Sequence, residues 1–185
     1  MRDDTRAKIQ EIALRLFTEQ GYEATSLREI AEELGVTKAA LYYHFKTKDD
    51  IVASLAEMRV AETDELLSWA RSQPKTAETR RELVSRYAAQ LERSRHQEIT
   101  RFLERNQTAL RDHPTIHRMR ERMIEVSDEL SSPDDPLDVK LRGSIALFTL
   151  HAGMWLTQHY DVTDDERRAT AKKVALEILE GHCDD

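Results

Sequence analysis

Apolar residues recur with the period of an α-helix along almost the whole of this chain of 185 residues. Ile9, Ala13, Leu16 and Phe17, for example, occupy the i, i+4, i+7 and i+8 positions that share one helix face. The chain has only 5 Gly and 4 Pro, whereas a β-sandwich or β-barrel needs many turn residues. The sequence therefore predicts an all-α protein.

Capping and breaking residues divide this pattern into about nine helices. Ser26 and Glu29 have the spacing of a capping box, which satisfies backbone N–H groups at a helix start. Gly21 and Gly35 can end the first and second helices because glycine tolerates the left-handed conformation found there. The expected helices cover residues 5–20, 26–34, 37–45, 49–71, 76–95, 98–111, 114–130, 137–160 and 163–181.

Composition excludes several classes of protein. With 28 Lys and Arg against 35 Asp and Glu, the net charge of −7 argues against a chain that is basic throughout and binds polyanions with its whole surface. The lone Cys183 cannot form an intramolecular disulfide or supply the four thiolates of a structural zinc site. Residues 1–5 are charged rather than signal-like, and the most apolar run, residues 145–150, is far shorter than the ~20 residues of a membrane span. We expect a cytoplasmic protein without a membrane partner, a metal or a cofactor.

Two short predicted helices, residues 26–34 and 37–45, have the size and spacing of a helix-turn-helix. In this motif the second helix enters the major groove of DNA. Residues 36–48 contain Lys38, Lys46 and Lys48 and no acid, although residues 1–52 carry 8 bases and 10 acids. Positive charge is therefore concentrated at the edge that would read DNA.

The first 55 or so residues also contain a dense set of further motifs. They are Ala13-Leu-Arg-Leu-Phe17, Gly21-Tyr22, Ala24-Thr-Ser-Leu27, Ile30-Ala31, Gly35-Val-Thr-Lys38 and Leu41-Tyr-Tyr-His-Phe-Lys-Thr-Lys48. Together they closely resemble the tetracycline-repressor (TetR) family of transcriptional regulators. The resemblance implies a helix-turn-helix DNA-binding domain at residues 1–50 and a helical regulatory and dimerisation domain at residues 51–185.

The resemblance also implies which residues contact DNA. Thr25 and Arg28 match positions that touch phosphate. Thr37, Lys38 and Ala39 open the recognition helix, where Lys38 can donate to guanine O6 and N7 and the Ala39 methyl can meet a thymine methyl. Many family members have Gly where Ala39 stands, so the base preference of a relative cannot be transferred.

The rest of the recognition helix supplies further expected contacts. Tyr42, Tyr43 and His44 match backbone-contacting positions, with Tyr42 also close to a base, although His44 could be a plain surface residue. Lys48 combines a cation with the free N–H groups of a helix start, which suits a phosphate. Adjacent helix positions cannot share one buried face, so at least one of the two tyrosine hydroxyls should be exposed.

The predicted eighth helix is apolar on nearly all sides between Ile145 and Leu156, so it must be buried on more than one face. The resemblance supplies the second face, because the last two helices of such proteins pack against their copies as a four-helix bundle in a twofold dimer. Gly143, Ala146 and Gly153 would allow close helix approach there. The ninth helix would complete the interface with Ala171, Val174, Ala175, Ile178 and Leu179.

Aromatic, methionine and histidine residues spread over several helices could enclose a pocket for a small-molecule effector or form plain core. The resemblance favours the pocket, with His151, His159 or Asn106 as its polar groups. Because no lysine lies among these positions, we expect a mainly apolar effector. The candidate ligand-binding residues are Tyr87, Phe102, Asn106, Met119, Met123, Phe148, His151, Trp155 and His159, with Trp69 nearby.

Two other clusters have simpler interpretations. His113 and His117 have the i, i+4 spacing of metal ligands, but Pro114 lies between them and no third ligand follows, so surface histidines explain them better. The arginines of residues 118–122 could bind an anion, but the interleaved Glu121 and Glu125 indicate a charged outer face.

The leading hypothesis is a dimeric, ligand-responsive regulator, most simply a repressor, that binds a palindromic DNA operator. A rival is a helix-turn-helix architectural protein or activator whose carboxy-terminal domain only dimerises and senses no ligand. An enzyme using Glu98, Glu104, Asp112 or His151 is the third class. No Ser/His/Asp, Cys/His or glycine-rich phosphate-binding arrangement supports catalysis.

Overall fold

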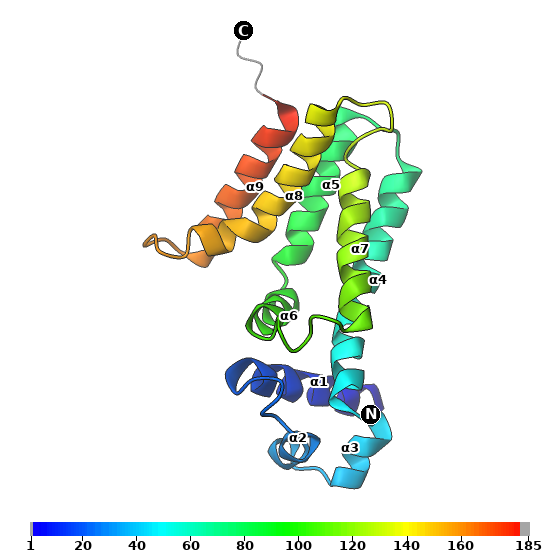
Figure 1. Ribbon diagram of the computed structural model, residues 1–185, viewed down its shortest axis with the longest axis vertical. Coiled ribbons are helices and arrows are strands. Elements are labelled where there is room, and N and C mark those ends of the chain that lie inside the picture. The colour runs from blue at the N-terminus through cyan, green and yellow to red at the C-terminus, as the bar shows by residue number, and fades with distance from the viewer. Residues whose placement is uncertain (1, 182–185) are drawn as a thin grey trace. The chain divides into compact units, whose positions relative to one another are not determined.

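The computed structural model describes residues 2–181 (Figure 1). Within this range the chain is all-helical, which confirms the predicted fold class. Cys183 and the side chain of Glu104 lie outside what the structure describes. The helices are α1 (Arg2–Glu19), α2 (Leu27–Leu34), α3 (Lys38–His44), α4 (Lys48–Ser72), α5 (Ala77–Leu91), α6 (Ser94–Arg105), α7 (Pro114–Asp128), α8 (Leu137–Leu156) and α9 (Asp164–Glu180).

Local capping explains the short helices α2 and α3. The Ser26 hydroxyl accepts a hydrogen bond from the Glu29 N–H, and the Glu29 carboxylate accepts one from the Ser26 N–H, as the capping box predicts. Gly35 ends α2 in the left-handed region, with a φ of 71°. Thr37 then caps α3 by accepting from the Ala40 N–H. The two helices are therefore delimited by their own sequence.

The expected boundary between the fifth and sixth helices is wrong, because α5 ends at Leu91 and α6 begins at Ser94. Two other helix ends differ from the prediction because of side chains that are distant in sequence. α6 ends at Arg105, since the Asn106 side chain bonds to the α1–α2 region and turns follow it. α8 ends at Leu156 rather than Tyr160. The Arg167 guanidinium donates to the carbonyls of Thr157, Tyr160 and Val162, which satisfies backbone acceptors without a further helical turn.

The chain divides into two compact units that do not follow the expected boundary at residue 50. Unit 1 contains residues up to Ala61 together with Ser94–Arg120, and unit 2 contains Glu62–Arg93 and the residues from Glu121 onward. The boundary differs because α4 continues unbroken past residue 50 and because α6 packs with α1. Both α4 and α7 contribute to both units.

The core of unit 1 holds the helix-turn-helix in place. Phe17 of α1 packs against Tyr22 and Phe102, with ring centroids 5.2 Å and 5.5 Å apart. Leu41 and Phe45 anchor α3 in the same cluster, as expected. Each such fully buried side chain contributes about 1.5–3 kcal/mol of transfer free energy, so α3 has a fixed place despite its seven residues.

In unit 2, α8 and α9 lie side by side (Figure 1). A Cβ added at Gly153 would lie 2.7 Å from the Ala171 Cβ, and one added at Gly143 would lie 3.0 Å from the Leu130 Cβ. Ala146 is fully buried in the core of unit 2. The prediction that these small residues serve an interface between copies is therefore wrong, because they pack inside one chain.

Ala171 and Ala175 are also buried within the chain, whereas Val174 is exposed. Of the predicted interface residues on α9, Ile178 and Leu179 are partly buried against the core of unit 2. None of the described helices has the length and apolarity of a membrane-spanning segment.

Candidate DNA interface

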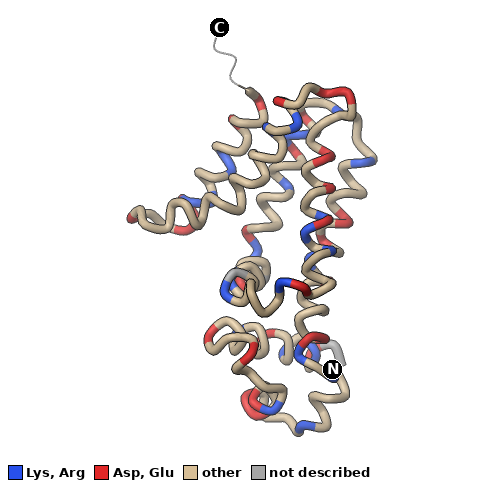
Figure 2. The backbone as a smooth tube through the Cα atoms, in the orientation of Figure 1, with Lys and Arg blue, Asp and Glu red and all other residues tan. Residues whose placement is uncertain are grey.

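The first turn of α3 is the exposed part of the helix-turn-helix. Residues 37–40 are exposed, while Leu41 and Phe45 on the opposite side are buried. The stretch from α3 into the turn that follows carries basic side chains and no acidic ones (Figure 2). The predicted base-contacting residues Thr37, Lys38 and Ala39 are thus accessible together at one helix start.

The two adjacent tyrosines of α3 are in different environments. Tyr43 is 60% exposed, whereas Tyr42 is partly buried against the core of unit 1. The Lys38 Nζ lies 5.4 Å from the centroid of the Tyr42 ring, and the rings of Tyr43 and His44 meet edge to face. Tyr43 therefore presents its ring and hydroxyl outward, and His44 lies beside it.

Thr25 does not have the exposed side chain that a phosphate contact needs. It is only 1% exposed, and its hydroxyl donates to the Gly21 carbonyl at 2.9 Å. The prediction of a side-chain phosphate contact is wrong here, because the hydroxyl stabilises the turn before α2. Arg28 is exposed, and its Nε donates to Glu32 at 2.7 Å, so a phosphate contact by Arg28 stays a prediction.

Lys48 is directed toward the protein rather than standing free at the start of α4. Its Nζ donates to the carbonyls of Tyr22 and Glu23 at 2.6 Å and 3.3 Å, and lies 4.5 Å from the Tyr22 ring centroid. An ammonium has three N–H donors, so one remains for a phosphate. The first role of Lys48 is to fasten the α1–α2 turn to α4.

Tyr22 is the centre of this fastening. Its N–H donates to the Asn106 Oδ1 at 2.8 Å, and its hydroxyl donates to the Asp49 carboxylate. Burial and this hydrogen bond raise the pKa of the Tyr22 hydroxyl above its usual range. The turn that precedes the helix-turn-helix is thus held both by α4 and by the residue that follows α6.

Asn106 is therefore a structural residue of unit 1. Only 8% of it is exposed, and its Nδ2 donates to the carbonyls of Phe17 at 3.2 Å and Phe102 at 2.8 Å. Its expected place as a polar group of an effector pocket is wrong, because its amide is used within the core. Tyr22, Asp49 and Asn106 were missed as residues that hold the α1–α2 turn, and only Tyr22 carried a sequence signal, within the Gly21-Tyr22 motif.

The other predicted pocket residues are divided between the two units. Phe102 and Met119 belong to unit 1, and the remaining six to unit 2. Phe148 and Trp155 are 66% and 63% exposed, so in the single chain they are surface residues. Tyr87 and His151 are brought together, with the Tyr87 Oη 2.8 Å from the His151 Nε2. The cavities described in the structure are lined by other residues.

The structure gives no support for a metal at the two histidines. The His113 Nδ1 lies 3.3 Å from the Thr115 backbone nitrogen, which donates to it. Among the described residues there is no group of three or more His, Cys, Asp and Glu suited to hold a metal ion. Arg118 pairs with Glu57, and Arg122 pairs with Asp64 and Glu125.

Comparison with known proteins agrees with this arrangement. Residues 9–55 match the family described as bacterial regulatory proteins, tetR family. The chain is 46% identical over 63 residues to the HTH-type transcriptional regulator AcrR of Shigella flexneri, a match that covers 34% of this chain and 29% of that protein. The alignment thus spans less than a third of that relative.

Solved structures match over nearly the whole chain. The crystal structure of Mycobacterium smegmatis AmtR has a TM-score of 0.73 and 28% sequence identity, covering 97% of this chain and 87% of that chain. The SmeT–triclosan complex has a TM-score of 0.69 and 20% identity, covering 94% and 90%, and shares the fold. Residues 9–55 therefore match the tetR family of bacterial regulatory proteins, and the chain as a whole shares the fold of the solved AmtR structure.

Proposed function

We propose that the protein is a transcriptional regulator that binds a palindromic operator with the α3 helices of two copies. The exposed first turn of α3 is the observation that carries this proposal. It offers Lys38 and Ala39 to base edges, and no acid lies between residues 36 and 48 to repel phosphates. Tyr43 and His44 can contact the DNA backbone beside it. Since the operator would lie on chromosomal DNA, we place the protein in the cytoplasm.

We infer a homodimer that uses the outer face of α8. Leu141, Ile145, Phe148 and Trp155 all expose large apolar side chains there. An exposed apolar patch of this kind is typical of a protein interface. For two α3 helices to enter successive major grooves on one side of DNA, the dimer would have to hold them about 34–36 Å apart.

We also propose that a small, mainly apolar effector regulates DNA binding. The solved SmeT–triclosan complex supports effector binding in this fold. The Tyr87–His151 pair in unit 2 would supply polar groups, and α4, which contributes to both units, would carry the change to the helix-turn-helix. The rival proposal, dimerisation without an effector, is favoured by the exposure of Phe148 and Trp155 in the single chain.

The DNA proposal is tested by selecting binding sites from random duplexes and measuring affinities by fluorescence anisotropy. We expect a palindromic site, and we expect Lys38→Ala to relax preference at one base position per half-site, at a cost of about 1–3 kcal/mol. Lys8→Ala is the matched control, since Lys8 is an exposed lysine of the same unit that pairs with Asp4. Equal losses for both variants, or selection of no palindrome, would contradict the proposal.

The effector proposal is tested by titrating triclosan as a probe in the presence and absence of operator. A ligand that binds the DNA-free state better must be weakened by operator to the same factor by which it weakens operator binding. Triclosan binding that is unaffected by operator would reject the coupling. If triclosan does not bind, the effector proposal fails in favour of a regulator that only dimerises.

A further inference from the structure

Unit 2 contains a cavity of about 560 Å³ that the proposed function does not use. It lies where the first turns of α5 and α8 meet the end of α9, and we call it the arginine cavity. Ala77, Arg80 and Arg81 of α5 and Asp138, Val139 and Arg142 of α8 line it, together with the last residues of α9. Its volume falls within the range of small-molecule sites.

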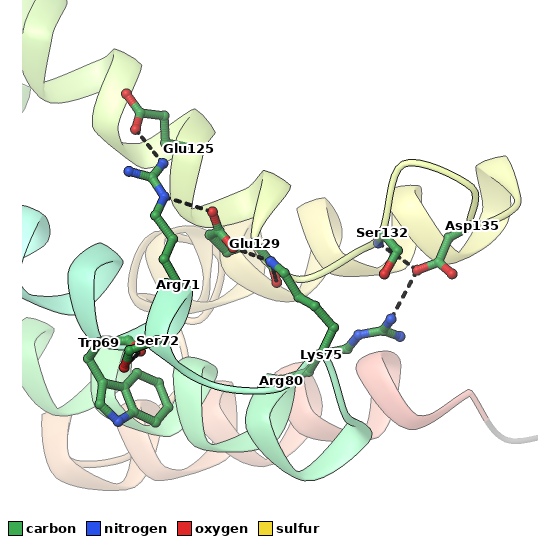
Figure 3. Close-up of polar contacts among 9 residues, drawn as sticks. All are labelled: Trp69, Arg71, Ser72, Lys75, Arg80, Glu125, Glu129, Ser132 and Asp135. Atoms are coloured by element: carbon green, nitrogen blue, oxygen red, sulfur yellow. Dashed lines mark hydrogen bonds and ion pairs between the residues drawn. The ribbon is translucent and has the colours of Figure 1, made fainter.

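The arginines of this cavity have more hydrogen-bond donors than their partners use. Arg80 donates to Asp135 at 3.0 Å through Nη2 (Figure 3), but its buried Nε has no hydrogen-bond partner. Arg81 pairs with Glu180 at 2.5 Å, and Arg142 pairs only loosely with Asp138, at 3.9 Å. Since each guanidinium carries five N–H donors, the three can donate hydrogen bonds to further anionic oxygens.

The electrostatic balance also favours an anion. Among the lining residues, three arginines outnumber two carboxylates, Asp138 and Glu180, on a chain of net charge −7, while Asp135, the partner of Arg80, lies outside the lining. The start of α8 adds to this field, because its N-cap is Pro136 and no side chain caps its first turn. An anion in this cavity would replace its hydrogen bonds to water with hydrogen bonds from the guanidinium groups.

The remaining lining residues indicate what else such a ligand contains. Ala77, Val139 and Leu179 provide apolar walls beside the guanidinium groups. We propose that the arginine cavity binds a small organic dianion, with its carboxylates on Arg81 and Arg142 and its carbon frame against these walls. Binding would compete with the Arg81–Glu180 pair that joins α5 to α9.

The test uses isothermal titration of the full chain without DNA, at low ionic strength, so its outcome is independent of the proposed DNA binding. The probes are isophthalate and glutarate, one aromatic and one aliphatic dicarboxylate. Isophthalamide serves as the uncharged counterpart, and inorganic phosphate as an anion without a carbon frame. We expect saturable binding of at least one dicarboxylate, and at least about fivefold weaker binding of isophthalamide and phosphate.

Substitutions assign the binding to this cavity. Arg81→Gln and Arg142→Gln should each weaken the bound dicarboxylate at least about fivefold, because each removes a bidentate partner. Glu180→Gln should tighten it about threefold, because it releases Arg81 and removes a competing charge. This opposite sign separates binding from damage to the fold. Arg168→Gln on α9, whose partner is Asp165, is the control and should not change the affinity.

The outcomes that would overturn the proposal are specific. No saturable binding of either dicarboxylate, or wild-type affinity in Arg81→Gln and Arg142→Gln, would show that the cavity is not an anion site. Isophthalamide that binds as tightly as the dicarboxylates would show that charge does not determine binding. Phosphate that binds as tightly would show that the apolar walls do not contribute. A Glu180→Gln variant that binds more weakly than wild type would show that Glu180 does not compete with the ligand.

Discussion

The buried amide of Asn106 connects three segments of unit 1 through hydrogen bonds to Phe17, Tyr22 and Phe102. Replacing it in Asn106→Leu would remove the side-chain partner of the Tyr22 N–H and of the Phe17 carbonyl, while the Phe102 carbonyl would still accept from the backbone N–H of residue 106. A buried unpaired group costs about 1–3 kcal/mol, so we expect a lower urea midpoint of unfolding and weaker operator binding. Gln107→Leu, an exposed neighbour, is the control. A midpoint unchanged by Asn106→Leu would show that these hydrogen bonds do not support the helix-turn-helix.

At the scale of helices, local sequence signals predicted several helix ends and core positions, whereas contacts between residues distant in sequence determine the others. The Ser26 capping box, the Gly35 terminus and the core positions of Leu41 and Phe45 could be predicted because each depends on residues within one turn. The ends of α6 and α8 depend on bonds made by Asn106 and Arg167, whose partners in space are not visible in a linear pattern. The inward-facing Lys48 escaped prediction for the same reason.

The pairing of α4 with α7 gives a prediction about pH. Arg71 of α4 donates to Glu125 at 2.8 Å and to Glu129 at 2.9 Å, and Lys75 also contacts Glu129 (Figure 3). The hydrogen bond from Arg71, opposed in part by burial, lowers the pKa of Glu125. Burial acts to raise the pKa of Glu129, but the hydrogen bonds from Lys75 and Arg71 outweigh it and lower that pKa as well.

A carboxylate whose pKa is lowered by folding stabilises the fold when the pH is above its ordinary pKa of 4.5. This stabilisation is lost as the pH falls through the lowered pKa. We therefore expect Glu129→Gln to reduce the free energy of unfolding at neutral pH by about 1 kcal/mol, and to reduce its loss in acid. Urea unfolding at neutral pH and below about pH 4 measures both effects. Glu177→Gln, in an exposed pair with Lys173 at 3.9 Å, is the control. Equal pH dependence in Glu129→Gln and wild type would contradict the assignment.

At the scale of the whole molecule, the apolar pattern of α8 predicted that the helix is buried on two sides. One of these sides packs against the core of the same chain. Ala146, Leu147 and Leu150 lie in the core of unit 2, while Ile145 and Phe148 are exposed. The pattern could not show which residues lie on each side. Phe148 and Trp155 were therefore assigned to the predicted pocket, and Gly153 was assigned to the predicted interface. Which apolar face meets the chain's own core and which meets a second copy depends on tertiary packing.

This division of α8 predicts how a single charge would act on assembly. Phe148 is 66% exposed, so Phe148→Asp should leave the chain folded, with a circular dichroism spectrum like that of wild type. In the dimer the new carboxylate would be buried without a partner, at a cost of about 3 kcal/mol or more, which raises the dimer dissociation constant at least about 100-fold. Operator binding should weaken with it, since a monomer engages only one half-site.

Sedimentation velocity at micromolar concentration measures the assembly. We expect wild type to sediment as a dimer and Phe148→Asp as a monomer. Ile124→Asp is the matched control, because Ile124 lies on α7 and is 58% exposed, and this variant should remain dimeric. Ile178→Asp would be less informative, since Ile178 packs partly against the core of its own chain and the variant could lose its fold first. A monomeric wild type, or a dimeric Phe148→Asp, would show that the outer face of α8 is not the surface that joins two copies.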